Sequence, residues 1–431
     1  MKMINFKIKS LWLTLALFFL GSTLLEAQNP EALTLDYCHE RLVEVYPLVR
    51  QKLMQDESSA LRIENLDKNY LPQFDLNARA SYQSEVTQVP ISLPGMDIPS
   101  PDKDMYDLYL GLNQLIWDGG VNRETKKIAE ADRIIAQQQI EVELYKMKER
   151  VNGLFFKILL FRQNRSLLLN NRQSVLDKLT EMESGIRHGA VLASSADALK
   201  AQILQIDQQV EELDIDLAAH YQMLSELLEM QIPLSRTLAL PEPNFDWASY
   251  ENQRPEYELL SMNQRKLELS KNQIASAYLP KVSGFGKLGY GKPGLNMLSN
   301  EFDSYYYLGL GLNWDILNWN KQKNQIKLLG VQQEIVETEK AAFDKNVKIQ
   351  VLDDRAQIMK YEKLISKDEE IILLRESISR SASSQLDNGV ITSSQYLDEL
   401  NRETRAKMSL EMHRIQQSLA KVNYLKTIGK L

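Results

Sequence analysis

The chain has 431 residues, of which 25% are charged and 8% aromatic, and its formal net charge is −7 at pH 7. This length allows two domains or one extended body, and the composition argues against intrinsic disorder. An acidic chain without a basic cluster is a poor candidate for nucleic-acid binding.

Residues 1–27 have the pattern of a secretory signal peptide. Three lysines precede an apolar run at 11–20, and the small residue Ala27 marks the predicted cleavage point. The rival interpretation is a membrane anchor, but the run is short for a spanning helix, which needs about 20 residues. Cleavage would remove a net charge of +2 and change the total from −7 to −9. We therefore expect an exported, acidic mature chain.

Cys38 is the only cysteine, which excludes an internal disulfide framework. It lies well beyond the signal, and Asp36 and Tyr37 precede it instead of the small residues of a lipid-anchor site. We interpret it as a small buried residue of an amphipathic helix. No long apolar segment follows residue 27, so any membrane-spanning part must be β-structure.

Two alternating segments follow Pro72, at about 73–86 and 104–117. Apolar residues occupy every second position, with polar or small residues between them. Period two predicts strands with one apolar face, each long enough for the roughly 9–11 residues of a tilted membrane strand. A soluble sheet packed on a core would alternate in the same way, so that interpretation stays open. The side chains expected to face lipid in this first pair are Phe74, Leu76, Tyr82, Leu108, Leu110 and Leu112.

A long helical hairpin is predicted after these strands. No proline occurs between 102 and 232, and apolar residues recur at steps of three and four. Proline inside a helix costs about 3 kcal/mol, and heptad spacing is typical of helices that pack on helices. Gly189 interrupts the pattern and Ser194 follows, as expected where one helix ends and the next begins. We therefore expect helices at about 121–187 and 192–232.

Beyond a linker at 233–254, the second half repeats the first. Pro47 and Pro72 have counterparts 208 positions later, and the string LGLN recurs after 200 positions. An internal duplication at this length is a strong signal, and it divides the mature chain into repeats at 28–232 and 255–431. The second repeat is expected to contain strands at about 281–292 and 304–317, helices at about 321–386 and 392–428, and the lipid-facing side chains Leu308, Leu310, Leu312 and Trp314.

Four strands in one chain are too few to close a barrel. The smallest membrane barrels have about eight strands and are filled by side chains, so a water-filled channel needs more. Three chains would supply twelve strands and a twelve-helix tube. The predicted fold class is therefore mainly α with membrane β. It is a duplicated β-hairpin plus a long coiled-coil helical hairpin, assembled as a trimeric 12-strand β-barrel continued by a 12-helix periplasmic α-barrel.

Several motifs recur in a fixed order along the mature chain. They are LTLDYCHERLVEVYP at 33–47, YLP at 70–72 and 278–280, IWDGGVNR at 116–123 and RPEYELL at 254–260. The counterpart of IWDGGVNR is ILNWNKQK at 316–323, which keeps the position but loses both glycines. In this order and spacing the chain resembles the TolC-like outer-membrane efflux proteins.

The resemblance implies a passive exit duct in the cell outer membrane that extends into the periplasm. It implies a homotrimer surrounded by outer-membrane lipid, docked to a periplasmic adaptor (membrane fusion) protein and an inner-membrane transporter. Such a duct serves a tripartite efflux or type I secretion system. The rival function is a periplasmic adaptor or coiled-coil interaction protein without a pore, which would normally carry one hairpin and soluble β-domains.

The resemblance also implies two kinds of functional residue. RHGAVLASS and DNGVITSSQYLDEL resemble the hairpin tips of the family. In the family these tips contact the adaptor, and acidic side chains just beyond them narrow the tunnel. The candidate constriction residues are Asp398, Gln395, which replaces one acidic residue, and Asp197. The candidate adaptor contacts are Arg187, Gly189, Val191, Gly389 and Ile391. An exposed helical carboxylate and ordinary turn chemistry remain the alternative explanations for these residues.

Two glycine patterns imitate nucleotide sites. GFGKLG at 284–289 and GKLGYGK at 286–292 would need to lead into a helix, but Pro293 and Gly294 follow and the residues alternate as in a strand. The four histidines lack metal-ligand spacing, and no nucleophile–base set is recognisable. We therefore expect neither an enzyme nor a cofactor.

Overall fold

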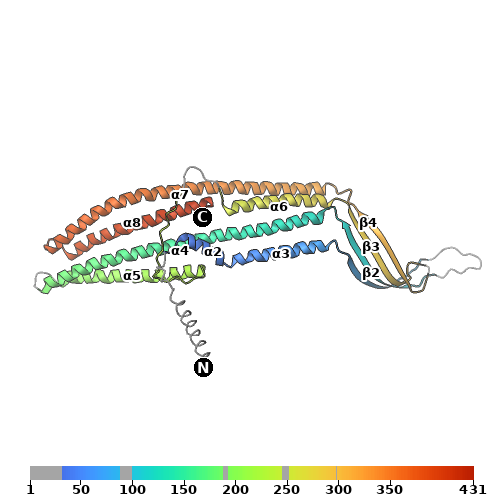
Figure 1. Ribbon diagram of the computed structural model, residues 1–431, viewed down its shortest axis with the longest axis horizontal. Helices are drawn as coiled ribbons and strands as arrows, with labels where there is room; N and C mark the ends of the chain where they lie inside the picture. Colours follow the sequence, from blue (N-terminus) through green and yellow to red (C-terminus); the bar gives the residue numbers. More distant parts are fainter. Residues whose placement is uncertain (1–31, 88–99, 188–192, 245–251, 298) are drawn as a thin grey trace, which may run out of the picture. The chain divides into compact units, whose positions relative to one another are not determined.

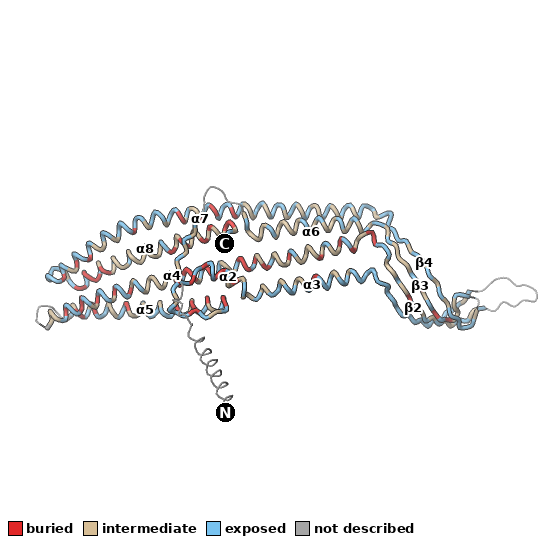
Figure 2. The backbone as a smooth tube through the Cα atoms, viewed as in Figure 1, coloured by how far each residue is buried: buried red, intermediate tan, exposed pale blue. Residues whose placement is uncertain are grey.

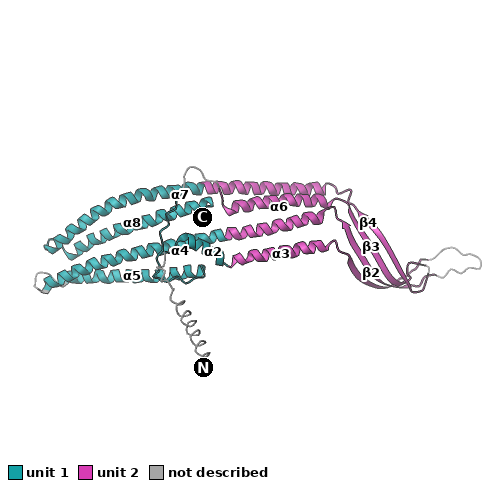
Figure 3. Ribbon diagram, viewed as in Figure 1, with its two compact units in different colours: residues 1–46, 144–251, 349–431 teal, residues 47–143, 252–348 magenta. Residues whose placement is uncertain are grey.

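The computed structural model describes residues 32–87, 100–187, 193–244, 252–297 and 299–431. The predicted signal peptide lies outside the described residues. The chain divides into two compact units (Figure 3). The tip unit comprises residues 1–46, 144–251 and 349–431, and the sheet unit comprises residues 47–143 and 252–348.

The sheet unit combines four helical segments with all four strands (Figure 1). The helical segments are α3 (Leu48–Lys68), α6 (Pro255–Ala277) and the first parts of α4 (Val121–Arg187) and α7 (Lys321–Asp387). Arg133 of α4 pairs with Asp56 of α3 at 2.8 Å, and Lys266 of α6 pairs with Asp132 of α4 at 2.6 Å. Proline is the first residue of α6, where a missing N–H leaves no bond unmade.

The strands are β1 (Gln73–Tyr82), β2 (Asp104–Trp117), β3 (Lys281–Lys292) and β4 (Asp303–Asn313). They form one antiparallel sheet in the order β1-β2-β3-β4, so β1 and β4 are its edges within the described residues. Gln73 pairs with Asn113, and Lys281 pairs with Asn313. The two hairpins therefore have the same register under the sequence repeat.

Two strands are shorter than predicted. β1 ends at Tyr82 instead of about 86, and β4 ends at Asn313 instead of about 317. The end of β4 has a physical cause, because Asn313 pairs with Lys281, the first residue of β3. Pro280 precedes Lys281 and has no N–H to continue the ladder. The apolar residues after Asn313 therefore extend the alternating pattern without extending the strand.

The tip unit contains α2 (Leu35–Val45), α5 (Ala193–Leu227), α8 (Ser393–Ile428) and the remaining parts of α4 and α7. Buried residues recur along these helices (Figure 2) and form two apolar clusters. Cys38 is fully buried and belongs to the same apolar cluster as Phe155 and Leu224, as its position in an amphipathic helix predicts. Burial raises the pKa of its thiol to about 12. α5 ends at Leu227, five residues before the predicted end at about 232.

Among the described residues, no helix combines the length and the apolar composition that crossing a membrane requires.

Candidate functional site: the two-faced sheet, its turns and the hairpin tip

One face of the sheet is apolar and remains exposed within the part of the chain that the structure describes. The register aligns Leu76, Leu110, Leu288 and Tyr306 across all four strands, and each is at least 42% exposed. Exposed residues predominate along the edge strands β1 and β4 and alternate with less exposed ones along β2 and β3, as Figure 2 shows for the sheet. Water-soluble monomers rarely leave a continuous apolar surface of this kind in solvent. The same face carries the predicted side chains Phe74, Tyr82, Leu108, Leu112, Leu308, Leu310 and Leu312.

The opposite face is polar and aromatic. The Tyr305 hydroxyl donates a hydrogen bond to the Asp107 carboxylate at 2.5 Å. The Lys287 ammonium lies 4.0 Å from the centroid of the Tyr109 ring and 5.7 Å from that of Tyr307. Rings in these positions stabilise a cation that has lost part of its water. This face can therefore hold charged and hydrogen-bonding groups.

Glycines on the polar face make room for the rings of neighbouring strands. A side chain at Gly289 would collide with the ring of Tyr305, and one at Gly309 would collide with the ring of Phe285. The glycines at 284–289 belong to β3 and do not lead into a helix. The structure therefore confirms that this string is a strand segment and does not form a nucleotide-binding loop.

Aromatic residues gather where the strands meet their loops. Tyr82, Tyr106, Tyr290 and Tyr306 lie at the same end of the sheet, because two strands end there and two begin there. The ring of Phe302 lies 5.5 Å from that of Tyr290 in a stacked arrangement. Trp314 was predicted within a strand but follows the last residue of β4, and it is 52% exposed.

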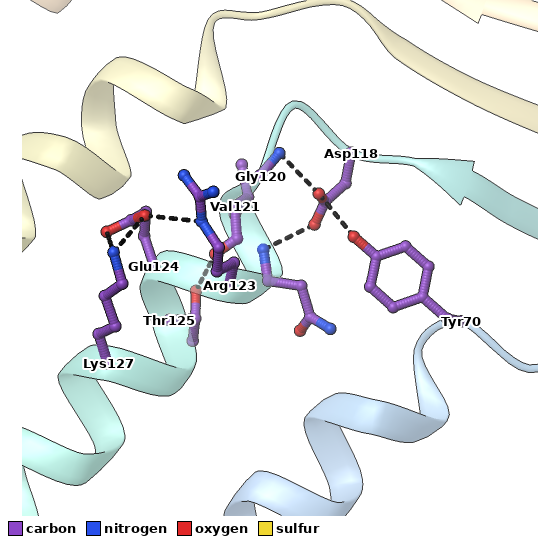
Figure 4. Close-up of polar contacts among 9 residues, drawn as sticks. Tyr70, Asp118, Gly120, Val121, Arg123, Glu124, Thr125 and Lys127 are labelled. Carbon is purple, nitrogen blue, oxygen red and sulfur yellow. Dashed lines mark hydrogen bonds and ion pairs between the residues drawn. The ribbon is translucent and has the colours of Figure 1, made fainter.

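A polar network closes the turn from β2 to α4 (Figure 4). The Asp118 carboxylate accepts hydrogen bonds from the backbone N–H of Gly120 at 2.9 Å and of Asn122 at 2.7 Å. It also accepts one from the Tyr70 hydroxyl at 2.8 Å. Gly119 and Gly120 adopt positive φ values of 75° and 91°, which glycine adopts without strain. The motif IWDGGVNR thus encodes a capped helix start.

The environment of this turn keeps its acids ionised. Burial alone would raise the pKa of Asp118, but the bonds from Asn122, Tyr70 and Gly120 outweigh it and lower the pKa. The buried Glu124 carboxylate pairs with Lys127 at 2.9 Å and with Arg123 at 3.1 Å, and the Lys127 bond contributes most to its lowered pKa. Negative charge in the first turn of a helix also complements the helix dipole.

The matching turn from β4 to α7 keeps the backbone but changes the side chains. Trp319 and Asn320 occupy the positions of the two glycines, with φ values of 49° and 63°. Asparagine tolerates this region, whereas a bulky tryptophan does so only at a cost of about 1–2 kcal/mol. The Trp319 side chain is 84% exposed, so little contact within the described chain offsets that cost.

The second hairpin tip is a short, fully capped turn. Gly389 has φ 71°, and the N–H of Val390 bonds to the carbonyl of Gln385 at 2.8 Å, which closes α7 in a Schellman motif. Thr392 and Gln395 then form a capping box at the start of α8. Val390 is 70% exposed, so the turn presents an apolar side chain to solvent.

The predicted tip and constriction residues have different surroundings. Gln395 serves in the capping box, and Ile391 packs against the neighbouring apolar cluster. Asp398 is exposed and pairs with Arg402 of its own helix at 2.8 Å, and Asp197 is exposed on α5. In the first tip, Gly189 and Val191 lie outside the described residues, and Arg187 is described only as the last residue of α4.

Lys178 is a tip residue that sequence patterns did not single out. Its side chain is 7% exposed, and its ammonium pairs with Asp387 at 2.6 Å and Glu181 at 2.7 Å. Burial alone would lower its pKa, but both carboxylates raise it and the net shift is upward. The Asp387 contact joins α4 to α7, so one buried cation ties the first hairpin to the second near their ends.

Within the described ranges, no three His, Cys, Asp or Glu side chains gather as they would around a metal ion.

Comparisons by sequence and by structure give different results. No protein-family model and no curated protein matches this sequence. Solved structures do match, including the outer membrane channel CmeC of Campylobacter jejuni, with a TM-score of 0.64 and 14% identity over 92% of this chain and 85% of that chain. The outer membrane protein VceC of Vibrio cholerae gives 0.65 and 13% over 92% of this chain and 96% of that chain.

The open state of the MtrE outer membrane channel of Neisseria gonorrhoeae also matches, with a TM-score of 0.65 and 15% identity over 92% of this chain and 88% of that chain. At such identities the similarity establishes the fold. It confirms, at the level of the fold, the predicted resemblance to TolC-like channels and the mainly helical architecture with a small antiparallel sheet.

Proposed function

We propose that this chain is an outer-membrane exit channel, the passive duct of a tripartite efflux or type I secretion system. The observation that carries the proposal is the uncovered apolar face of the sheet, backed by a polar face and continued by long helical hairpins. The shared fold with outer membrane channels supports the same conclusion. The protein would then reside in the outer membrane, reach into the periplasm, and belong to the TolC-like family.

The energy of the apolar face favours lipid as its neighbour. A fully buried leucine or phenylalanine gains about 1.5–3 kcal/mol relative to an exposed one. Moving this face from water into hydrocarbon would therefore stabilise each chain on the order of 10 kcal/mol. The residues that contribute are Phe74, Leu76, Leu108, Leu110, Leu288, Leu308, Leu310 and Leu312.

The edges of the sheet favour assembly of several copies. β1 and β4 each pair on one side only within the described chain, and unpaired backbone groups cannot remain in hydrocarbon. Pairing β4 of one copy with β1 of the next is a head-to-tail contact, which closes into a ring. Two copies would give about eight strands and a plugged barrel, whereas three would enclose water. We therefore propose a homotrimer with a 12-strand barrel and a 12-helix tunnel.

The helical hairpins are the proposed docking end for a periplasmic adaptor and an inner-membrane transporter. The exposed Val390 beside Gly389 and Ile391 offers an apolar contact point at the second tip. Arg187, Gly189 and Val191 are the proposed counterparts at the first tip. Asp398 remains the proposed constriction residue, with Asp197 as a second candidate. The ion pair of Asp398 with Arg402 offsets part of its charge, so we expect a weaker acidic ring than three free carboxylates would give.

The test compares two arginine substitutions on opposite faces of β4. Leu310→Arg places a cation on the apolar face, where a charge near the bilayer midplane costs about 2–4 kcal/mol, whereas Asn313→Arg places the same cation on the polar face. We expect the unmodified protein and Asn313→Arg to fractionate with outer membrane, run as a trimer and conduct ions in planar bilayers. Leu310→Arg should reduce insertion strongly.

Equal behaviour of the two variants would refute a lipid-facing apolar surface. Recovery of the unmodified protein in the periplasm without detergent, with no conductance, would favour the adaptor alternative.

A further inference from the structure

The chain contains one complete example of the junction that must form between copies. β2 and β3 pair across the boundary of the two repeats, and the hairpins on either side have equivalent registers. Beside this pair, the β2–α4 turn docks on the corner where α6 leads into β3. A β-carbon at Gly119 would lie 2.7 Å from the β-carbon of Leu279 and 2.7 Å from the carbonyl oxygen of Ser276. The two surfaces therefore touch at Gly119.

The sequence repeat identifies the corresponding surfaces at the two edges of the sheet. Gly119 corresponds to Trp319 after a shift of 200 positions, and Ser276 and Leu279 correspond to Lys68 and Leu71 after a shift of 208. Leu71 is 55% exposed and lies two residues before the start of β1, while Trp319 lies six residues after the end of β4. Each half of the expected junction is thus present and uncovered, at opposite edges.

We propose that Trp319 packs on the Lys68–Leu71 corner of the next copy in the ring, and this rests on the proposed head-to-tail assembly. The strained backbone supports the assignment, because it holds a large ring away from its own chain. The apolar Leu71 side chain offers a surface for the ring, and the Lys68 ammonium can lie over the indole.

The junction between copies must also be wider than the junction within a chain. At Gly119 there is no space even for a methyl group, so an indole cannot enter an identical arrangement. The three junctions between copies would then differ from the three within chains, with a tryptophan filling each wider gap. Two similar repeats in each of three copies would give a ring of six similar units. Because the two kinds of junction differ, the ring would have threefold and not sixfold symmetry at these junctions.

A thiol cross-link between copies tests the proposal in the full-length chain. The variant Trp319→Cys, Leu71→Cys places two thiols on opposite sides of the widened junction. A disulfide needs β-carbons about 3.5–4.5 Å apart, so the test uses a short bifunctional maleimide that can span the space left by the indole. Cys38 is fully buried and does not compete. We expect the bifunctional maleimide to give covalent dimers and trimers on a denaturing gel, and neither single variant to do so. Trp319→Cys combined with Leu61→Cys is the positional control, because Leu61 is exposed on α3 but lies about 10 Å or more from Leu71.

The outcomes separate the two proposals. A native trimer without the 71–319 cross-link overturns this contact and leaves the proposed channel intact, whereas a monomer overturns both. A second measurement uses the native side chain. The emission of Trp319 is the difference in tryptophan fluorescence between the unmodified protein and the variant Trp319→Phe. If the next copy covers the ring, brominated lipid should not quench this difference. Strong quenching in an intact trimer would assign the ring to lipid and overturn the contact.

Discussion

The Asp118 network at the β2–α4 turn provides a sharp test of how sequence specifies this fold. Asp118→Ala removes the acceptor for two backbone N–H groups and for the Tyr70 hydroxyl. Loss of a helix-capping side chain costs about 0.5–2 kcal/mol, and a buried donor left without a partner costs about 1–3 kcal/mol. Asp118 is 7% exposed and Asn122 is 4% exposed, so water replaces these bonds poorly. We expect a local loss of about 3 kcal/mol.

Hydrogen exchange at the amides of Gly120 and Asn122 measures this loss directly. A change of about 3 kcal/mol corresponds to roughly a hundredfold faster exchange, because each 1.4 kcal/mol is a factor of about ten. Asp118→Asn is the matched control, since it keeps an acceptor oxygen and is the residue found at position 318 of the second turn. It should lose less than half as much protection. Unchanged exchange in Asp118→Ala, or equal losses in both variants, would contradict the argument.

The same site predicts a pH dependence. The pKa of Asp118 is lowered in the folded chain, so the ionised carboxylate stabilises the turn above the unfolded value of about 3.9. That stabilisation is lost as the pH falls through the lower folded value. Protection at Asn122, corrected for the intrinsic exchange rate, should therefore be constant from neutral pH to about pH 4 and fall below it. Asp118→Asn should lack this fall, and an equal fall in both proteins would assign it to other groups.

Three further predictions concern the hairpin tip. Gly389→Ala should destabilise the turn by about 1 kcal/mol, seen as faster exchange at Val390, because no atom crowds the site but φ is 71°; Gly330→Ala, in open space within α7, should be neutral or stabilising. Lys178→Met should lower the local free energy of opening at the end of α7 by about 1–2 kcal/mol, measured by hydrogen exchange, because it removes a buried ion pair. The control Lys200→Met removes an exposed ion pair with Glu183 and should change this free energy by less than about 0.5 kcal/mol. Asp398→Ala should raise single-channel conductance or antibiotic leakage and Arg402→Ala should increase cation preference; no change in conductance or leakage with Asp398→Ala would remove Asp398 from the gate.

The parts of the fold that follow from the sequence are those set by the periodicity of apolar residues and by glycine at helix ends. Alternation along the strands indicated which residues share a face, since period two is a property of the extended chain itself. Gly389 indicated a helix end, because a left-handed residue there allows two orphan carbonyls to be bonded. Alternation could not indicate where β4 stops. That end depends on Pro280, a residue of the partner strand, so it is a property of pairing and not of the local pattern.

The residues of the candidate site were harder to predict from the sequence, because their roles also depend on neighbours from other parts of the chain. The Thr392–Gln395 spacing is a recognisable capping box, a role that the resemblance did not indicate; the predicted place of Gln395 at the constriction stays a prediction. Lys178 looks like any other surface lysine of a charged helix until α7 places Asp387 beside it. The left-handed backbone at Trp319 could have been inferred, because it occupies the place of a glycine in the repeat. A large residue that replaces a glycine in one copy of a duplicated motif is therefore a candidate for a contact between subunits.

The two faces of the sheet also constrain each other. The apolar face tolerates large leucines because none of the described residues covers them, while the polar face must fit the rings of Tyr305 and Phe285 over Gly289 and Gly309. Side chains crowd more on the concave side of a curved sheet, where glycine relieves the crowding. Glycines concentrated on the polar face therefore favour curvature toward that face. Such curvature would turn β1 and β4 toward the edges of neighbouring copies and would leave Leu308, Leu310 and Leu312 on the convex side, in contact with lipid.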